Sequence, residues 1–137
     1  CANNGFSLHL IKPFGFSLSD KLLKRAQMDY HSNIKPNIHN CFEKFLNEVQ
    51  EKNIVIISKF GKKNYTEAKY TNDSILLFGS ETRGLSSEII KKYEKKVYRI
   101  PMIEKSRSIN LSNAVAIVSY EVWRQLKFSG AINLVKI

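Results

Sequence analysis

The sequence lacks the features that would place it in a membrane, outside the cell or around a metal ion. No apolar run approaches the roughly 20 residues that a membrane-spanning helix requires, and no signal peptide is recognisable. Its two cysteines, Cys1 and Cys41, have neither the spacing of metal ligands nor that of a disulfide framework. We therefore expect a cytoplasmic protein that uses no metal and no membrane.

The signatures of several common enzyme classes are missing as well. Neither G-x-G-x-x-G nor G-x-x-x-x-G-K-[ST] is present, so nothing indicates a standard Rossmann or P-loop site. There is no G-x-S-x-G, and no closely spaced cysteine and histidine suggests covalent catalysis. The sequence also lacks internal repeats, low-complexity tails and linkers, which favours a single domain over residues 1–137.

What the sequence has in excess is positive charge. Its 137 residues are 43% hydrophobic and 25% charged, which suits a globular domain with its own core. Lysine and arginine number 22 against 12 acidic residues, for a formal net charge of +10. Such an excess attracts polyanions, and nucleic acid is the usual partner. A biased genome composition, which the many Asn, Ile and Lys residues suggest, would have the same effect, so charge alone only favours RNA or DNA.

Apolar patterning predicts an α/β fold with a mostly parallel sheet. Residues 54–58 and 74–78 are largely apolar runs, typical of strands buried on both faces of a parallel sheet. Residues 6–11 alternate like a strand, and 97–100 form another short strand that Pro101 ends. Helices are expected over residues 20–28, after Asn40, and over 87–93 and 114–126. The order of these elements predicts helices on both faces of the sheet.

The last of these helices carries the clearest periodicity. Ser112 or Asn113 is a natural N-cap, because a short polar side chain can accept hydrogen bonds from the free amides of the first turn. Apolar residues recur at steps of three and four and so share one face. They are Leu111, Val115, Val118, Val122 and Leu126.

Two polar loops stand at the ends of predicted strands. Gly79 and Gly84 bracket Glu81 and Arg83 directly after the strand over 74–78, and residues 106–113 hold serines, asparagines and an arginine between apolar segments. Open parallel sheets bind ligands beyond the carboxyl ends of their strands. A tight turn and a helix cap would account for parts of these loops, but we favour a ligand pocket. Backbone groups between apolar walls suit an adenine-containing ligand.

Both loops resemble motifs of a known family. Residues 78–85 look like the second motif of the SPOUT (knotted) RNA methyltransferases. Residues 100–102 and 110–114, with Tyr120-Glu121, look like the third. The chain as a whole is most similar to the small single-domain tRNA (cytidine/uridine-34) 2′-O-methyltransferases. Further matching stretches are Cys1-Ala2-Asn3, Gly15-Phe16, Asp20-Lys21, Arg25-Ala26, Asp29-Tyr30-His31 and Trp123-Arg124-Gln125-Leu126.

The resemblance implies a fold, a cofactor and partners. It implies the SPOUT fold with a C-terminal trefoil knot, S-adenosylmethionine bound in the knot, a homodimer, and tRNA as substrate. The expected reaction is 2′-O-methylation of the wobble ribose. Carried over by position, the cofactor-binding residues would be Ile57, Gly79, Ile100, Met102, Ser108 and Leu111.

The resemblance also implies roles in catalysis and RNA binding. Ser108 and Asn110 would support cofactor and substrate near the methyl group, and Glu81 would orient its loop. RNA contacts would come from Tyr120, Arg83 and Arg107, with the Tyr120 ring stacking on a base. The main catalytic arginine of the family belongs to its first motif, just before the stretch that matches Cys1-Ala2-Asn3. We therefore expect an N-terminally incomplete form without that strand and motif.

Three other interpretations remain open. A SPOUT enzyme could methylate ribosomal RNA or another tRNA position, although no extra RNA-binding domain is seen. A basic RNA-binding module without catalysis is a second alternative, which the pocket motifs disfavour. A parallel α/β domain with no enzymatic role is the third. Which tRNAs are modified, and whether cytidine or uridine is preferred, does not follow from the sequence.

Overall fold

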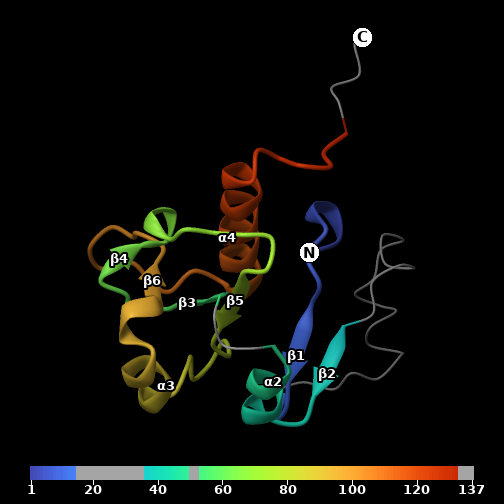
Figure 1. Cartoon of the computed structure of the whole chain (residues 1–137). Coiled ribbons are helices and arrows are strands. Elements are labelled where there is room, and N and C mark those ends of the chain that lie inside the picture. The colour runs from blue at the N-terminus through green and yellow to red at the C-terminus, as the bar shows by residue number, and fades with distance from the viewer. Residues whose placement is uncertain (15–35, 50–52, 133–137) are drawn as a thin grey trace, which may run out of the picture. The chain divides into compact units, whose positions relative to one another are not determined.

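The computed structural model describes residues 1–14, 36–49 and 53–132, and the chain divides into two compact units, Cys1–Glu51 and Lys52–Ile137 (Figure 1). Each unit has its own parallel sheet, so each is described by itself. The helix expected over residues 20–28 lies outside the described residues. No helix in the described ranges is long and apolar enough to cross a membrane.

The first unit is built on a short parallel strand pair. A 3-10 turn over Ala2–Asn4 ends at Gly5, whose φ of 75° is left-handed and suits glycine. The strands are β1 (His9–Ile11) and β2 (Asn37–His39), so β1 is shorter than the predicted strand over 6–11. Helix α2 (Phe42–Val49) contacts β2 and buries two side chains, those of Phe45 and Leu46.

The second unit contains a four-stranded sheet in the order β4-β6-β3-β5. These strands are β3 (Ile54–Ile57), β4 (Lys63–Asn64), β5 (Ile75–Phe78) and β6 (Val97–Arg99), and every pair is parallel. All four residues of β3 are buried, as the apolar run predicts for a central strand. The expected parallel pairing is confirmed within each sheet, although the described strands form two sheets.

The register brings the carboxyl ends of three strands together. Ile57 at the end of β3 lies opposite Phe78 at the end of β5. On its other side, Ile57 lies opposite Tyr98 in β6. The loops that leave these strands therefore start from one edge of the sheet.

Three helical segments link or follow the strands of this unit before the last helix. They are the 3-10 turns η3 (Tyr65–Glu67) and η4 (Glu94–Lys96) and helix α3 (Ser87–Lys92). The Ser86 hydroxyl caps α3 by accepting a hydrogen bond of 3.3 Å from the Ile89 amide. The predicted helix over 87–93 is thus confirmed to within a residue.

The last helix, α4, spans Leu111–Gln125 and starts three residues earlier than expected. Its N-cap is Asn110, whose Oδ1 accepts from the amides of Ser112 (2.9 Å) and Asn113 (3.4 Å). The prediction of Ser112 or Asn113 as the cap is therefore wrong. A cap at Asn110 adds a further helical turn, and asparagine is among the best capping residues.

The predicted apolar face of α4 is only partly covered. Val118 and Val122 are fully buried, whereas Leu111, Val115 and Leu126 are half-buried. The helix contacts β5 of its own unit. Two other residues of this helix, Ile117 and Tyr120, are exposed by 38% and 46% of their areas.

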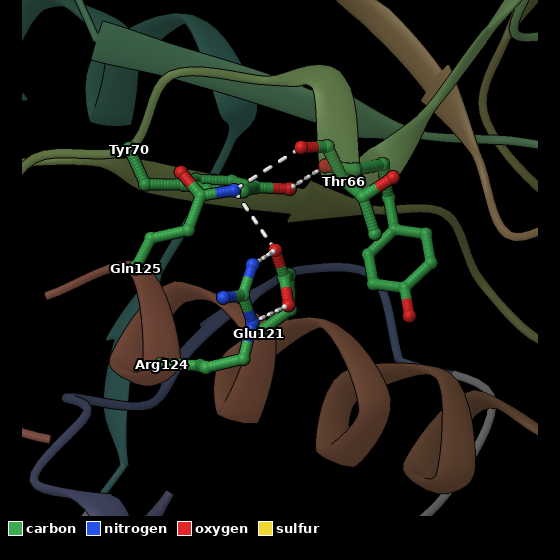
Figure 2. Close-up of polar contacts among 6 residues, drawn as sticks. Thr66, Tyr70, Glu121, Arg124 and Gln125 are labelled. Atoms are coloured by element: carbon green, nitrogen blue, oxygen red, sulfur yellow. Dashed lines mark hydrogen bonds and ion pairs between the residues drawn. The ribbon is translucent and has the colours of Figure 1, made fainter. Parts of the chain in front are cut away.

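A polar cluster fastens the end of α4 to the segment around η3 (Figure 2). Buried Glu121 accepts two hydrogen bonds from Arg124, at 2.7 and 2.8 Å, and a third from Gln125 Nε2 at 2.9 Å. Gln125 Nε2 also donates to the Thr66 carbonyl at 3.2 Å, and the Tyr70 hydroxyl donates to the Tyr65 carbonyl at 2.6 Å. The Gln125–Thr66 hydrogen bond thus joins residues that are 59 apart in sequence.

Candidate functional site

A cavity of about 230 Å³ lies at the edge of the four-stranded sheet where β3, β5 and β6 end. The two polar loops named from the sequence, residues 79–85 and the segment before α4, both contribute to its wall. The predicted site residues in the lining are Ile57, Gly79, Glu81, Arg83, Ile100, Met102, Ser108 and Leu111. All six residues expected around the cofactor thus meet in one cavity.

Three of the predicted residues are not part of the cavity lining. Asn110 is the exposed N-cap of α4. Arg107 is exposed in the loop before it. Tyr120 lies three turns along α4, where its ring meets the Trp123 ring edge-on at 5.7 Å between centroids. The structure therefore separates the expected RNA contact Tyr120 from the expected RNA contact Arg83.

The loop over 79–85 folds back on itself, and this explains its two glycines. The Gly84 amide donates to the Ser80 carbonyl at 2.9 Å, and the two residues form an isolated antiparallel bridge. A Cβ on Gly79 would lie 2.3 Å from the Gly84 carbonyl carbon and 2.4 Å from the Leu85 nitrogen. Gly84 has a φ of +68°, which other residues adopt at a cost. The tight turn that needs the two glycines also places Glu81 and Arg83 in the cavity lining.

One side chain ties the two loops together. Asn110 Nδ2 donates to Glu81 Oε1 at 3.0 Å, while Asn110 Oδ1 caps α4 and also accepts from the Ser112 hydroxyl at 2.6 Å. Both ends of the amide are thus engaged. The position of Glu81 at the cavity is coupled to the start of α4 by this contact.

Ten residues of the cavity lining were not named individually as site residues. Several of them adjoin predicted ones in the two loops or at the strand ends, among them Ser58, Phe78, Leu85 and Ile109. Phe60, on the turn after β3, was not anticipated and is 65% exposed. The sequence could have indicated Phe60, because it follows the strand over 54–58 just as Gly79 follows the strand over 74–78, and parallel strands end at the same edge of a sheet.

The cavity is lined by apolar and polar side chains in similar measure. Ile57, Phe78 and Met102 contribute apolar surface, whereas the polar lining includes the hydroxyls of Ser58 and Ser108, the Glu81 carboxylate and the cations Lys59 and Arg83. Such a lining suits a ligand with an apolar ring and an end that carries charges of both signs. Within residues 1–14, 36–49 and 53–132, no group of three or more His, Cys, Asp or Glu side chains is arranged to hold a metal ion.

Comparison with known proteins identifies the class to which this fold and site belong. The sequence matches the SpoU rRNA Methylase family over residues 1–120. A curated relative, the tRNA (cytidine(34)-2'-O)-methyltransferase of Escherichia coli strain K12, is 42% identical over 134 residues. That alignment covers 96% of this chain and 85% of the relative.

Solved structures agree with the sequence match. A Bacillus anthracis protein is 38% identical with a TM-score of 0.89, covering 98% of this chain and 87% of that one. A structure described as giving insights into the 2-OH methylation of C/U34 on tRNA is 37% identical, with a TM-score of 0.82 and coverage of 93% and 83%. An AdoMet-bound rRNA methyltransferase from Sinorhizobium meliloti is 25% identical, with a TM-score of 0.72 and coverage of 88% and 46%.

The parallel α/β units, with a cavity at the strand ends, are thus those of a SPOUT methyltransferase. The chain belongs to the SpoU rRNA Methylase family. The resemblance drawn from the two loop motifs is confirmed.

Proposed function

We propose that this protein methylates the ribose 2′-hydroxyl of the wobble nucleotide, C or U at position 34, in tRNA. The observation that carries the proposal is the cavity at the ends of β3, β5 and β6, where all six expected cofactor residues meet. The relative whose name states this reaction shares 42% of its residues over nearly the whole chain, which supports the choice of substrate.

The cavity residues fit S-adenosylmethionine, which would supply an electrophilic methyl group on a sulfonium. The apolar side chains of Ile57, Ile100 and Met102 would hold the adenine ring, with backbone groups at the strand ends as hydrogen-bond partners. Gly79 and Leu111 would complete the pocket. The Glu81 carboxylate would attract the positive end of the cofactor.

Residues around the methyl group would position the substrate. Ser108, in the lining, would hold the ribose or the cofactor by its hydroxyl, and Asn110 would hold Glu81 through the 3.0 Å hydrogen bond. Methyl transfer needs an in-line approach of the hydroxyl oxygen and a group that takes its proton. The resemblance predicts an arginine of the family's first motif for the second task, and this stays a prediction.

RNA would be held at the cavity mouth and on α4. Arg83, in the lining, and Arg107, in the exposed loop, would contact phosphates. Tyr120 would contact RNA from α4. Tyr120 does not line the cavity of its own chain, and this supports a role for it at the cavity of a second copy of the chain.

The proposal includes the finer features of the family fold. These are helices on both faces of the sheet, a C-terminal trefoil knot, a homodimer and a cytoplasmic location. The partly exposed Ile117 and Tyr120 on α4 support a dimer contact there, and tRNA as substrate supports the location.

Two other functions receive less support. Methylation of ribosomal RNA is the activity in the description of the Sinorhizobium meliloti protein, but that protein shares 25% of its residues against 37% and 42% for the two tRNA enzymes. A basic RNA-binding module without catalysis would have no use for a cavity lined by Ile57, Gly79 and Ser108.

The test is methyl transfer by the full gene product from labelled S-adenosylmethionine into total tRNA, followed by mapping of the modified nucleotide. We expect a 2′-O-methyl group at nucleotide 34. A label elsewhere in tRNA, or only in ribosomal RNA, would replace the proposed substrate. The same protein is examined by calorimetry with S-adenosylmethionine, and no heat of binding would favour the non-catalytic module.

A further inference from the structure

Phe60 lines two concave surfaces of the second unit. It lines the cavity described above and also a second hollow of about 270 Å³. At 65% exposure it is among the most exposed large apolar residues of the described chain. An exposed aromatic ring adds nothing to the core, and at the mouth of a binding cavity it is a candidate contact for a ligand.

The turn that carries Phe60 is held firmly. The Phe60 amide donates to the Ser58 hydroxyl at 3.4 Å, and the Gly61 amide donates to the Ser58 carbonyl at 3.1 Å. Gly61 is buried against β6, where a Cβ would lie 2.3 Å from the Tyr98 carbonyl carbon. The Ser58 amide in turn donates to the Tyr98 carbonyl at 2.9 Å. The backbone therefore presents the ring at a defined place.

The second hollow, here called the Phe60 hollow, has an apolar floor and a charged rim. It is lined by Phe60, Lys62, Ile90, Lys91, Glu94 and Val97. Val97 is buried and Ile90 is half-buried, so they form the floor. Lys62 and Glu94 are joined by an ion pair of 2.6 Å across the rim. An aromatic face, an aliphatic floor and cations at the edge match a flat ring attached to an anionic backbone.

The surroundings of the hollow are strongly basic. Lys59 Nζ lies 5.3 Å from the centre of the Phe60 ring. The two segments that form the rim, 59–63 and 91–96, contain seven lysines and one acidic residue, Glu94. Such a surface complements the phosphates of a nucleic acid, and it adjoins the cavity through the shared Phe60 ring.

We propose that the Phe60 hollow binds an unpaired nucleobase of the RNA substrate, next to the nucleotide whose ribose enters the cavity. This base stacks on Phe60, and its phosphate lies near Lys91, since Lys62 is already paired with Glu94. The proposal rests on the proposed function, because it takes the RNA in the hollow to be the RNA that is methylated. It makes Phe60 a substrate-positioning residue, distinct from the residues that hold the cofactor.

The test measures the KM for a tRNA anticodon stem-loop and, separately, the affinity for S-adenosylmethionine. Base stacking on an aromatic side chain corresponds to a roughly 5- to 150-fold effect, so Phe60→Ala is expected to raise the KM for RNA by a factor in that range. Phe60→Tyr, which keeps the aromatic face, should stay near the wild-type value. Because Phe60 also lines the cavity, cofactor affinity is measured in all three proteins, and it should change by a much smaller factor than the KM for RNA.

A chemical change in the RNA isolates the contact. Removing the base on one side of nucleotide 34, as an abasic site, should raise the KM of the wild type and leave that of Phe60→Ala unchanged. The proposal would be overturned if the abasic site raised the KM of Phe60→Ala as much as it raises that of the wild type, whether the site is placed before or after nucleotide 34. So would a loss of cofactor affinity in Phe60→Ala as large as the loss for RNA, which would assign the ring to the cofactor.

A spectroscopic probe reports stacking without catalysis. Trp123 is the only tryptophan, so Phe60→Trp in a Trp123→Phe background places a single indole at the hollow. We expect the stem-loop to quench its fluorescence, and the abasic stem-loop to quench less. Ile132→Trp in the same background is the matched control, because Ile132 is 93% exposed and does not line the hollow. Wild-type protein that methylates no RNA at all would overturn the proposed function, whereas normal methylation with no effect at Phe60 would overturn only the hollow.

Discussion

At the scale of single residues, the cavity requires a residue without a side chain at position 79. Gly79 has no Cβ, and the loop over 79–85 passes where one would be, 2.3 Å from the Gly84 carbonyl carbon. Backbone atoms on both sides of such a contact cannot move apart without opening the loop. Glu81, and with it the hydrogen bond to Asn110, depends on the loop being closed.

We expect Gly79→Ala to weaken S-adenosylmethionine binding by at least about tenfold, because the loop must open to admit the methyl group. Calorimetric titration with the cofactor gives the measurement. Gly130→Asn is the control, since Gly130 also has open space around it and a positive φ that asparagine tolerates, and it does not line the cavity. Unchanged cofactor affinity in Gly79→Ala would mean that the loop conformation is not required for binding.

At the scale of elements, α4 is attached at both of its ends. At the start, Asn110 caps the helix and holds Glu81. At the end, Glu121 and Gln125 connect it to the carbonyl of Thr66 (Figure 2). The double hydrogen bond from Arg124 holds the pKa of the Glu121 carboxyl below its usual range. Burial, with the charge of Glu121 nearby, raises the pKa of Tyr70.

The Glu121 cluster predicts a pH dependence of stability. Because the folded protein lowers the pKa of Glu121, its contribution is present above the ordinary carboxyl pKa and is lost as the pH falls through the folded value. Glu121→Gln should therefore lower the free energy of unfolding at pH 7 by about 1–2 kcal/mol, a value reduced by the solvent exposure of Arg124. The difference from the wild type should shrink in acid. Urea unfolding at the two pH values measures it.

Exposed Glu88, in the first turn of α3, provides the comparison for this charge removal. Glu88→Gln should change the free energy of unfolding by a few tenths of a kcal/mol, about the value of a surface charge near a helix N-terminus. Equal losses in the two variants would show that the Glu121 cluster contributes no more than a surface charge.

At the scale of the whole molecule, the net charge of +10 governs how the protein meets RNA. Lysines and arginines that neutralise phosphates release the counterions of the nucleic acid, so affinity falls as salt rises. The cavity is different, because apolar walls supply much of the contact to a small ligand.

We expect tRNA affinity to fall with salt at a log–log slope of several units, at roughly 0.7 to 0.9 for each neutralised phosphate. Binding measured by fluorescence anisotropy between low and physiological salt gives the slope. If Lys91 contacts RNA at the Phe60 hollow, Lys91→Gln should make the slope shallower by the contribution of about one phosphate contact. Cofactor affinity over the same range is the internal control and should be nearly flat. A tRNA slope no steeper than that of the cofactor would contradict a phosphate-driven interaction.

Local patterns in the sequence predicted most of the elements, and the resemblance of two loops to a known family supplied the expected cavity residues, whereas the short strands β2 and β4 were not predicted. The apolar run over 54–58 predicted a strand buried on both faces, and parallel strands end at one edge of their sheet, which favoured a shared site for Ile57, Gly79 and Ile100. The pairing of β3 with both β5 and β6 then made these strand ends neighbours. Their neighbours in the chain carried the motifs that identify the family.

Tertiary structure decided the contacts between segments that are far apart in the chain. Asn110 and Glu81 are 29 residues apart, and Gln125 and Thr66 are 59 apart, and no periodicity records such a pairing. The start of α4 is a similar case, because Asn110, Ser112 and Asn113 can all cap a helix and only the folded chain selects among them. The Phe60 hollow likewise arises where the turn after β3 meets α3 and η4. The sequence gives the type of each side chain, but its hydrogen-bond partner depends on which segments the folded chain brings within hydrogen-bonding distance.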